Sequence, residues 1–330
     1  MARIAKIRSS NFLKPKPLEA GQKIGIIAPG SAMSEDRFAA GLAEIKRRGF
    51  EALCPLDPTK GLGKNAFTSA SPEARAQAIM DLVSNPEVGL ILAARGGYGS
   101  AELLTLLDFE KIRESRKLFM GYSDVTVLLV ALASQAGLAS VHGATLSAEL
   151  ARAQSDTEAR LSSDLAFDLA QGKKHKKPLH CLVARELQFG TTKVSGRLIV
   201  GNLTMLISLL GTPWDLSFDQ AILVIEDVNE APYRVHRNLL HLKQAGKLAQ
   251  LSGLVFGRFS HNNTTNVSGQ CTVDEMIKQS VDELFAGTKF PILYGLPVGH
   301  DGKNLPLAFG SKAQIKPEGM LVTKDTAVEA

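Results

Sequence analysis

Short apolar segments alternate with amphipathic ones through the first half of the chain, and this alternation limits the fold more than any other feature. Strands are predicted in the apolar segments "KIGIIAPG", "VGLILAARGGYG", "KLFMGYSD" and "ASVHGAT". Helices are predicted in segments with helical spacing, namely "RFAAGLAEIKRRGF", "SAELLTLLDFEKIRE" and "DVTVLLVALASQAG". This order favours a parallel sheet with helices on both faces. Functional groups gather at the carboxyl ends of such strands, where the sequence has Gly30, Gly97 and Ser123.

The second half is richer in strands. They are predicted in "KVSGRLIVG", "QAILVIEDV", "LSGLVFGRFS", "FPILYGLPVGH" and "KAQIKPEGMLVT". Helices are expected around residues 201–210, 234–248 and 273–285. A polar stretch that contains "QGKKHKKP" separates the halves. We therefore expect an α/β protein with an N-terminal domain over 1–165, a linker over 166–190 and a β-rich α+β domain over 191–330.

Composition points to a soluble protein of a reducing compartment. The chain has 330 residues, of which 45% are hydrophobic, so it can bury a substantial core. Cys54, Cys181 and Cys271 form no CxxC pair, which disfavours a disulfide framework or a zinc site. The basic N-terminus lacks the apolar core of a secretory signal, and no apolar run approaches the roughly 18 residues of a membrane span. We expect a cytoplasmic location and no membrane partner.

The basic cluster "GKKHKKP" contributes to a net charge of +5. Its lysines are Lys173, Lys174, Lys176 and Lys177. Such a cluster can bind nucleic acid, but no aromatic side chains interleave with it to stack on bases. A solvated loop is the commoner role, and we expect no nucleic-acid partner.

Glycines after strands raise the question of a phosphate-binding loop. The segment "GIIAPGSA" has the glycine spacing of a P-loop, but Ser31 and Ala32 stand where lysine and a hydroxyl residue belong. In "GGYGSAE", Gly97 and Gly99 fit the dinucleotide pattern, but Glu102 occupies the third glycine position. Both motifs fail at a position that contacts phosphate or packs the helix, so we expect no nucleotide cofactor.

A metal site is not expected either. His236 and His241 are five residues apart, about 140° around a helix, and so face different ways. Neither lies in an HExxH motif.

Ser123 follows an apolar strand at an abrupt polar turn, "GYSD". A serine at a sharp strand-to-helix turn is exposed at the sheet end, among backbone N–H groups that can stabilise an oxyanion. Gly121 suits the close approach that such a turn needs, but Val125 replaces the small residue expected two positions after the serine. Alternatively, Ser123 caps the next helix and Asp124 favours the helix dipole. The segment alone leaves both readings open.

A nucleophilic serine needs a base and an acid that orients the base. His300 ends "FPILYGLPVGH" ahead of a glycine-rich turn, and His142 follows a predicted strand. Glu226 ends the apolar strand "AILVIEDV", where a carboxylate is costly to bury without a partner. The alternative is that Glu226 and Asp227 begin a solvated loop.

Taken in order, these motifs resemble the LD-carboxypeptidase family of serine peptidases, which includes the microcin C immunity peptidases. The resemblance covers about residues 22–317 and rests on "GIIAPGS", "RGGYGS", "GYSDVT", "HG" at 142–143, "GNLTML", "LLGTPW", "VIEDVNEAPYRVHRNL" and "GLPVGHDGKNLPLAFG". It implies a Rossmann-like N-terminal domain, a β-rich C-terminal domain, a site between them and a homodimer. Residues 1–20 and the basic cluster fall outside the family pattern.

The resemblance also implies roles for individual residues. The family's nucleophile matches Ser123, its glutamate matches Glu226 and its histidine matches His300. The backbone amides of Asp124 and Gly97 match the oxyanion hole. No cofactor is implied.

The substrate implied is a cytoplasmic muropeptide, a tetrapeptide from which the enzyme releases terminal D-Ala during peptidoglycan recycling. Because an arginine fork suits a free carboxylate, Arg234 is our first candidate for substrate binding and Arg95 the second, with Tyr233 shaping the pocket. Alternatively, Arg234 caps or pairs within the helix that it begins.

Two other functions are considered. An immunity-type peptidase would cleave an acyl-sulfamoyl adenylate and would need an aromatic platform for adenine. The single tryptophan, Trp214, lies in a segment that the wider family shares, and the sequence shows no added aromatic loop, which disfavours this function. A non-catalytic binding module would lack a member of the triad, whereas Ser123, Glu226 and His300 are all present.

Overall fold

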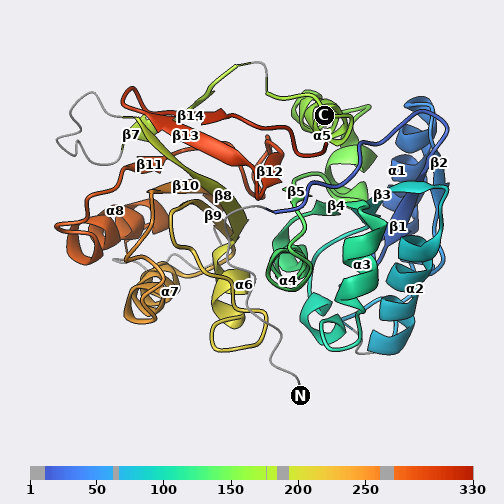
Figure 1. Cartoon of the computed structure of the whole chain (residues 1–330), viewed down its shortest axis with the longest axis horizontal. Helices are drawn as coiled ribbons and strands as arrows, with labels where there is room; N and C mark the ends of the chain where they lie inside the picture. The colour runs from blue at the N-terminus through green and yellow to red at the C-terminus, as the bar shows by residue number, and fades with distance from the viewer. Residues whose placement is uncertain (1–11, 62–66, 176, 184–192, 261–270, 330) are drawn as a thin grey trace.

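The protein consists of two halves, each built around its own β-sheet (Figure 1). The computed structural model describes residues 12–61, 67–175, 177–183, 193–260 and 271–329. The N-terminal half, blue to green in Figure 1, lies beside the C-terminal half, yellow to red. The prediction of an α/β protein with a Rossmann-like first half and a β-rich second half is confirmed.

The N-terminal sheet has the strand order β12-β5-β4-β3-β1-β2. Its strands are β1 (Lys23–Ile27), β2 (Glu51–Leu53), β3 (Val88–Ala93), β4 (Leu118–Gly121), β5 (Ser140–His142) and β12 (Leu307–Phe309). The first five run parallel, so their carboxyl ends lie at one edge of the sheet. Strand β12 comes from the other half of the sequence and pairs antiparallel with β5.

Helices cover both faces of this sheet. They are α1 (Glu35–Arg47), α2 (Pro72–Ser84), α3 (Phe109–Ser115), α4 (Thr126–Ala131) and α5 (Thr157–Ala170), with the shorter turns η1 (Ser100–Leu103), η2 (Ser123–Val125), η3 (Leu132–Ala136) and η4 (Leu146–Leu150). Neighbouring strand residues point to opposite faces: Ile26 belongs to the same buried cluster as Ile45 of α1, and Ile27 to the cluster that contains Ile79 of α2. This alternation, buried on both sides, gives the apolar runs seen in the sequence.

The C-terminal sheet has the order β6-β14-β13-β8-β9-β10-β11-β7. Its strands are β6 (Leu179–His180), β7 (Leu182–Val183), β8 (Val194–Asn202), β9 (Ala221–Val228), β10 (Gly253–Ser260), β11 (Ile292–Tyr294), β13 (Lys312–Lys316) and β14 (Met320–Thr323). The strands β8 to β11 run parallel, and the outer strands are antiparallel. Three helices accompany them near the predicted places: α6 (Leu203–Ser208), α7 (Pro232–Gln244) and α8 (Val273–Leu284).

Several expected boundaries differ from the structure. Helix α5 runs to Ala170, so the expected domain boundary at 165 falls inside a helix, and the expected linker over 166–190 contains two short strands of the second sheet. The single helix predicted over 100–114 is instead η1 and α3, because the Asp108 side chain caps a new helix by accepting from the Lys111 N–H at 3.1 Å.

The two halves pack against each other. The apolar core on the α2 face of the first sheet continues into the second half, and α4 packs against α6. The main chain of Glu329, near the end, bonds Pro15, near the beginning, at 2.9 Å. No helix in the described part of the chain combines the length and the apolar character needed to span a bilayer.

The basic cluster is partly held by the fold. Lys173 pairs with Asp168 at 2.6 Å, and the Lys174 ammonium donates to the carbonyl of Lys324 at 2.9 Å. Lys176 lies outside the described residues. The absence of a nucleic-acid partner stays a prediction.

Candidate active site

Ser123 stands at the carboxyl end of β4, at the first residue of η2. Its φ angle is +65°, a left-handed conformation that residues with a side chain rarely adopt, and the preceding Tyr122 is fully extended. Such a backbone costs on the order of 1–3 kcal/mol and is found mainly where function requires it. The sharp strand-to-helix turn predicted for this serine is therefore present.

Missing side chains make room for this turn. A Cβ on Gly121 would lie 2.9 Å from Val125 Cγ1, so the bulky Val125 is accommodated because Gly121 has no side chain. A Cβ on Gly96, in the loop after β3, would lie 2.9 Å from Ser123 Cβ. Val125 therefore does not prevent the elbow, although the sequence departs from the usual pattern.

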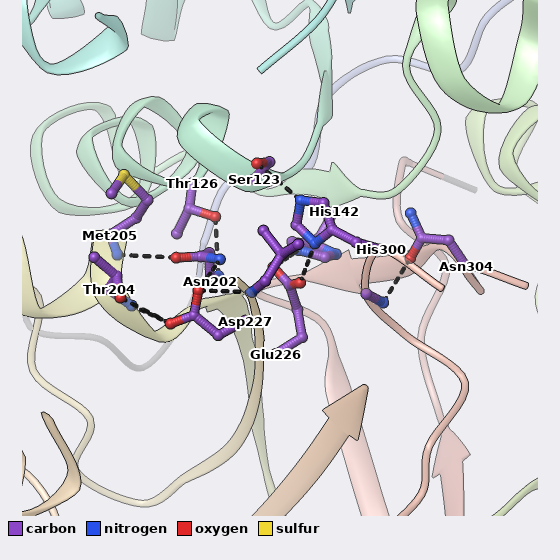
Figure 2. A network of polar contacts seen from close by, with 12 residues as sticks. Ser123, Thr126, His142, Asn202, Thr204, Met205, Glu226, Asp227, His300 and Asn304 are labelled. Carbon is purple, nitrogen blue, oxygen red and sulfur yellow. Dashed lines mark hydrogen bonds and ion pairs between the residues drawn. The ribbon is translucent and has the colours of Figure 1, made fainter. Parts of the chain in front are cut away.

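The structure brings Ser123, His300 and Glu226 together from three distant parts of the chain (Figure 2). The Ser123 hydroxyl lies 3.0 Å from His300 Nε2, and His300 Nδ1 lies 2.7 Å from Glu226 Oε2. Glu226 is fully buried and the His300 side chain is 19% exposed. Nucleophile, base and orienting acid thus form one continuous hydrogen-bonded line.

The electrostatics of the site favour a base that readily takes up a proton. Burial is the largest single effect and opposes a charged His300. The charge and hydrogen bond of Glu226, together with the charges of Asp227 and Glu149, outweigh burial and raise the pKa of His300 above its usual 6.5. The Tyr122 ring packs against the imidazole with 5.0 Å between ring centroids, which helps to fix its orientation.

Glu226 is placed by the second sheet. It lies near the end of β9, paired with Asn202 of β8. A Cβ on Gly257 or on Gly299 would lie 3.3 Å from Glu226 Cβ, so these two glycines let β10 and the His300 loop approach the carboxylate closely. Both Glu226 and Asp227 are buried, and the alternative that they begin a solvated loop is wrong.

Asp227 serves the structure rather than the imidazole. Its carboxylate accepts from Asn202 Nδ2 at 2.8 Å and from the Thr204 N–H and hydroxyl at 3.0 and 2.8 Å. Burial, followed by the charge of Glu226, raises the pKa of Asp227 to about 6. The Asn202 N–H in turn donates to Thr126 Oγ1 at 3.1 Å, which ties β8 to α4 of the first half.

His142 lies behind the serine. It ends β5 and pairs with Gly121 of β4, and its side chain is fully buried. Its Nε2 is 3.9 Å from Glu226 Oε1, the carboxylate oxygen that does not face His300. Burial lowers the pKa of His142 to about 4, so this imidazole stays neutral at pH 7.

Asn304 and Glu149 hold the His300 loop, and sequence reasoning did not identify either. Asn304 Oδ1 accepts from the Gly299 N–H at 3.1 Å, and Asn304 Nδ2 donates to Glu149 Oε1 at 3.2 Å. Glu149 is buried, and its second oxygen accepts from the Thr145 N–H at 2.9 Å. The loop is thereby anchored to the opposite half of the protein.

The predicted oxyanion donors lie beside the serine. Asp124 follows it directly, and Gly97 lies in the loop that packs on it, with φ of +96°. Among the hydrogen bonds of the described residues, none is donated by the N–H of Gly97 or of Asp124. The Asp124 side chain points to the Ser100 N–H, at 2.9 Å. Use of the two amides by an oxyanion stays a prediction.

The predicted substrate-binding residues do not join the triad network. Arg95 donates to the carbonyl of Ala32 at 2.8 Å. Arg234, at the start of α7, donates to the Tyr233 hydroxyl at 3.2 Å and lies 3.7 Å from Glu230. The alternative that Arg234 pairs locally therefore describes this state, and recognition of a carboxylate by these residues stays a prediction.

Known proteins resemble this chain over most of its length. The family described as LD-carboxypeptidase N-terminal domain matches residues 24–143, and LD-carboxypeptidase C-terminal domain matches residues 195–315. A Synechocystis protein named as a carboxypeptidase is 32% identical over 306 residues, which cover 92% of this chain and 95% of that protein.

Two further relatives carry more specific names. The murein tetrapeptide carboxypeptidase of Pseudomonas aeruginosa is 28% identical and covers 89% of this chain and 93% of its own length. The microcin C7 self-immunity protein MccF of Escherichia coli is also 28% identical, over 93% of this chain and 94% of its own.

Solved structures agree with the sequences. The crystal structure of muramoyltetrapeptide carboxypeptidase from Oxalobacter formigenes has a TM-score of 0.78 and 30% identity, and it covers 94% of this chain and 100% of that chain. MccF in complex with aspartyl sulfamoyl adenosine has a TM-score of 0.81 at 23% identity, over 96% of this chain and 100% of that one, and shares the fold. On these matches, which confirm the resemblance inferred from the motifs, the chain belongs to the LD-carboxypeptidase family of peptidases.

Proposed function

We propose that this protein is a serine L,D-carboxypeptidase that releases terminal D-Ala from cytoplasmic muropeptide tetrapeptides during peptidoglycan recycling. One observation carries the proposal: a strained serine is joined through His300 to the buried Glu226 by contacts of 3.0 and 2.7 Å. The Pseudomonas and Oxalobacter relatives, whose names specify murein or muramoyl tetrapeptides, support the choice of substrate.

In the first half of the reaction, His300 Nε2 takes the proton from Ser123 Oγ as that oxygen attacks the carbonyl carbon before D-Ala. Glu226 stabilises the imidazolium and keeps Nδ1 protonated toward itself. The carbonyl oxygen becomes an oxyanion, which accepts from the N–H groups of Gly97 and Asp124. Loss of one such donor typically costs about 100- to 1000-fold in rate.

In the second half, the tetrahedral intermediate collapses. The C–N bond breaks, and His300 gives its proton to the departing amine. D-Ala leaves, and the rest of the peptide stays bound to Ser123 Oγ as an ester. Water then attacks the ester while His300 takes a proton from it. The ester C–O bond breaks as His300 returns that proton to Ser123 Oγ, and the free enzyme and the shortened peptide are released.

Recognition of the terminal carboxylate falls to Arg234 in this proposal, with Tyr233 beside it and Arg95 as the alternative. Arg234 is accessible, since its side chain is 48% exposed, and it can exchange Glu230 for a substrate carboxylate. Replacement of Arg234 by methionine raises KM with little change in kcat if it binds ground state and transition state equally. An unchanged KM would assign the role to Arg95.

A second candidate function is hydrolysis of an acyl-sulfamoyl adenylate, as the MccF relative suggests. One observation favours it: Tyr98, in the loop that packs on Ser123, is 58% exposed and forms an edge-to-face pair with Phe67, which is 74% exposed, at 6.1 Å between ring centroids. Such rings can stack on a nucleobase. Trp214, the single tryptophan, packs partly against the core.

A panel of substrates separates the two functions. We expect D-Ala release from the free tetrapeptide and from the disaccharide tetrapeptide, and none from the pentapeptide, whose terminal bond joins two D-residues. Aspartyl sulfamoyl adenosine serves as the competing substrate. Faster hydrolysis of the adenosine compound than of both tetrapeptides would overturn the muropeptide assignment and favour the second function.

We further propose that the enzyme acts in the cytoplasm as a homodimer. Light scattering coupled to size-exclusion chromatography tests the dimer, and a mass near 35.4 kDa, that of one chain, would contradict it.

A further inference from the structure

A cavity of about 600 Å³ lies at the beginning of β5, whereas His142 lies at the other end of that strand. Both halves of the protein and both ends of the chain contribute to its walls. The lining residues used below are Phe12, Lys14, Arg116, Arg197, Lys312 and Asp325. Its volume is within the range of about 300–1,000 Å³ that is usual for small-molecule sites. It contains no member of the triad.

Arg197, on β8, is a buried cation in the lining of this cavity. The residue is only 9% exposed, and its guanidinium carbon lies 4.5 Å from the centre of the Phe12 ring. No salt bridge or hydrogen bond to its guanidinium occurs among the described residues, and its buried Nε has no partner there. Burial alone lowers the pKa of Arg197 to about 10, which is the signature of a cation without a nearby counter-charge.

A second arginine shows what Arg197 lacks. Arg48 also lies over a phenylalanine, with its guanidinium carbon 4.5 Å from the centre of the Phe167 ring. Arg48, however, pairs with Glu44 at 2.8 Å and with Asp164 at 2.7 Å. Arg48 is thus paired with two carboxylates, whereas Arg197 faces a cavity.

The remaining charges leave the cavity positive. Arg116 is neutralised by an ion pair with Glu329, whereas the Lys14 ammonium donates only to the uncharged Thr326 hydroxyl, at 3.3 Å. Lys312 adds a further cation, and Asp325 is the one other carboxylate of the lining. Four cations therefore face two anions, and a buried cation without a partner is costly unless an anion joins it.

We propose that this cavity binds a small organic anion, whose phosphate or carboxylate group pairs with the fork of Arg197 and with Lys312. The planar guanidinium, held on one face by Phe12, presents its N–H edge for two parallel bonds to such a group.

Thermal unfolding of the full chain tests the proposal. The probes are inorganic phosphate and succinate, each compared with sodium chloride of equal ionic strength. At concentrations well above Kd, we expect at least one probe to raise Tm by about 2 °C or more over chloride. The probe with the larger shift identifies the preferred group, and calorimetric titration of that probe gives its Kd. Equal Tm values in all three salts would overturn the proposal.

Variants assign the effect to the cavity. R197M keeps an unbranched apolar side chain on β8 but removes the charged guanidinium that lies over Phe12, and we expect it to lose the anion-dependent shift. The matched control R48M removes the other stacked arginine and, although less stable, keeps the shift. If R197M is too unstable to measure, K312M, which alters an exposed lysine, is expected to weaken binding at least tenfold. Full retention of the shift by R197M, or of the wild-type Kd by K312M, would show that the anion binds elsewhere.

Discussion

Replacing Glu226 with glutamine tests how the buried carboxylate acts on the base. Glutamine keeps the shape of the side chain and still offers an oxygen to His300 Nδ1, now 2.7 Å from Glu226 Oε2, but it removes the negative charge. The imidazolium that forms during attack then lies in a buried site without its counter-charge. Loss of the orienting carboxylate of a triad lowers kcat by about 10⁴-fold, or about 5.5 kcal/mol of barrier.

The same substitution changes the pH dependence. Burial lowers the pKa of His300, and Glu226 is the main group that raises it again. His300 must be neutral to accept the serine proton, so kcat/KM of the wild type rises with pH through a pKa above 6.5. In E226Q, burial acts with less opposition, and this rise moves to lower pH.

D-Ala release from the tetrapeptide, measured between pH 5 and 9, provides the assay. The control is D227N, which removes the adjacent buried carboxylate, whose oxygens bond Asn202 and Thr204 instead of His300. We expect D227N to lose stability but to keep kcat within about tenfold of the wild type. A loss of less than tenfold in E226Q, or a rise displaced to higher pH, would refute this reasoning.

Three further substitutions test the surroundings of the triad. The pKa of His142 is about 4 in the folded protein and 6.5 in the unfolded chain. His142 therefore contributes about 3 kcal/mol of stability above pH 6.5, and this contribution is lost as the pH falls through 4. H142Q should abolish this part of the acid dependence of urea unfolding, and equal profiles for wild type and H142Q would contradict the prediction. N304L removes the hydrogen bond that Asn304 Oδ1 accepts from the Gly299 N–H. We expect the free energy of unfolding to fall by about 1–3 kcal/mol and kcat to fall more than KM changes. Unaltered kinetics would show that this bond does not determine the position of His300. G96A places a Cβ 2.9 Å from Ser123 Cβ, and the displaced nucleophile should lose about 100-fold in kcat, measured on folded protein checked by circular dichroism; full activity would mean that the loop yields instead.

Local patterns predict the strands that are buried on both faces of a sheet. Strands β1, β3, β4 and β9 each contain a continuous apolar run, and a run of that kind is recognisable without knowledge of its neighbours. Strand β12 is different, because its three residues acquire their role by pairing with β5, more than a hundred residues earlier in the chain. The division of residues 100–114 at Asp108 likewise depends on a cap whose strength the apolar spacing does not reveal.

The candidate site divides in the same way. Ser123 was suggested by its turn and Glu226 by the cost of an acid on an apolar strand, while their union with His300 came from family resemblance. Asn304 carries no local signal, since its partners Glu149 and Gly299 come together only when the halves pack. Arg197 was overlooked because an arginine in a strand reveals neither the ring beneath it nor the missing carboxylate.

The central claim is that Ser123 is the nucleophile that releases D-Ala, and wild type beside S123A tests it most directly. Both proteins are given the same purified tetrapeptide, and D-Ala release and peptide affinity are measured together. The account predicts release by the wild type, a loss of about 10⁶-fold in kcat for S123A, and nearly unchanged peptide binding. Release by S123A at a rate near that of the wild type would contradict the account, because the line from Glu226 through His300 would then end on a residue that the reaction does not use.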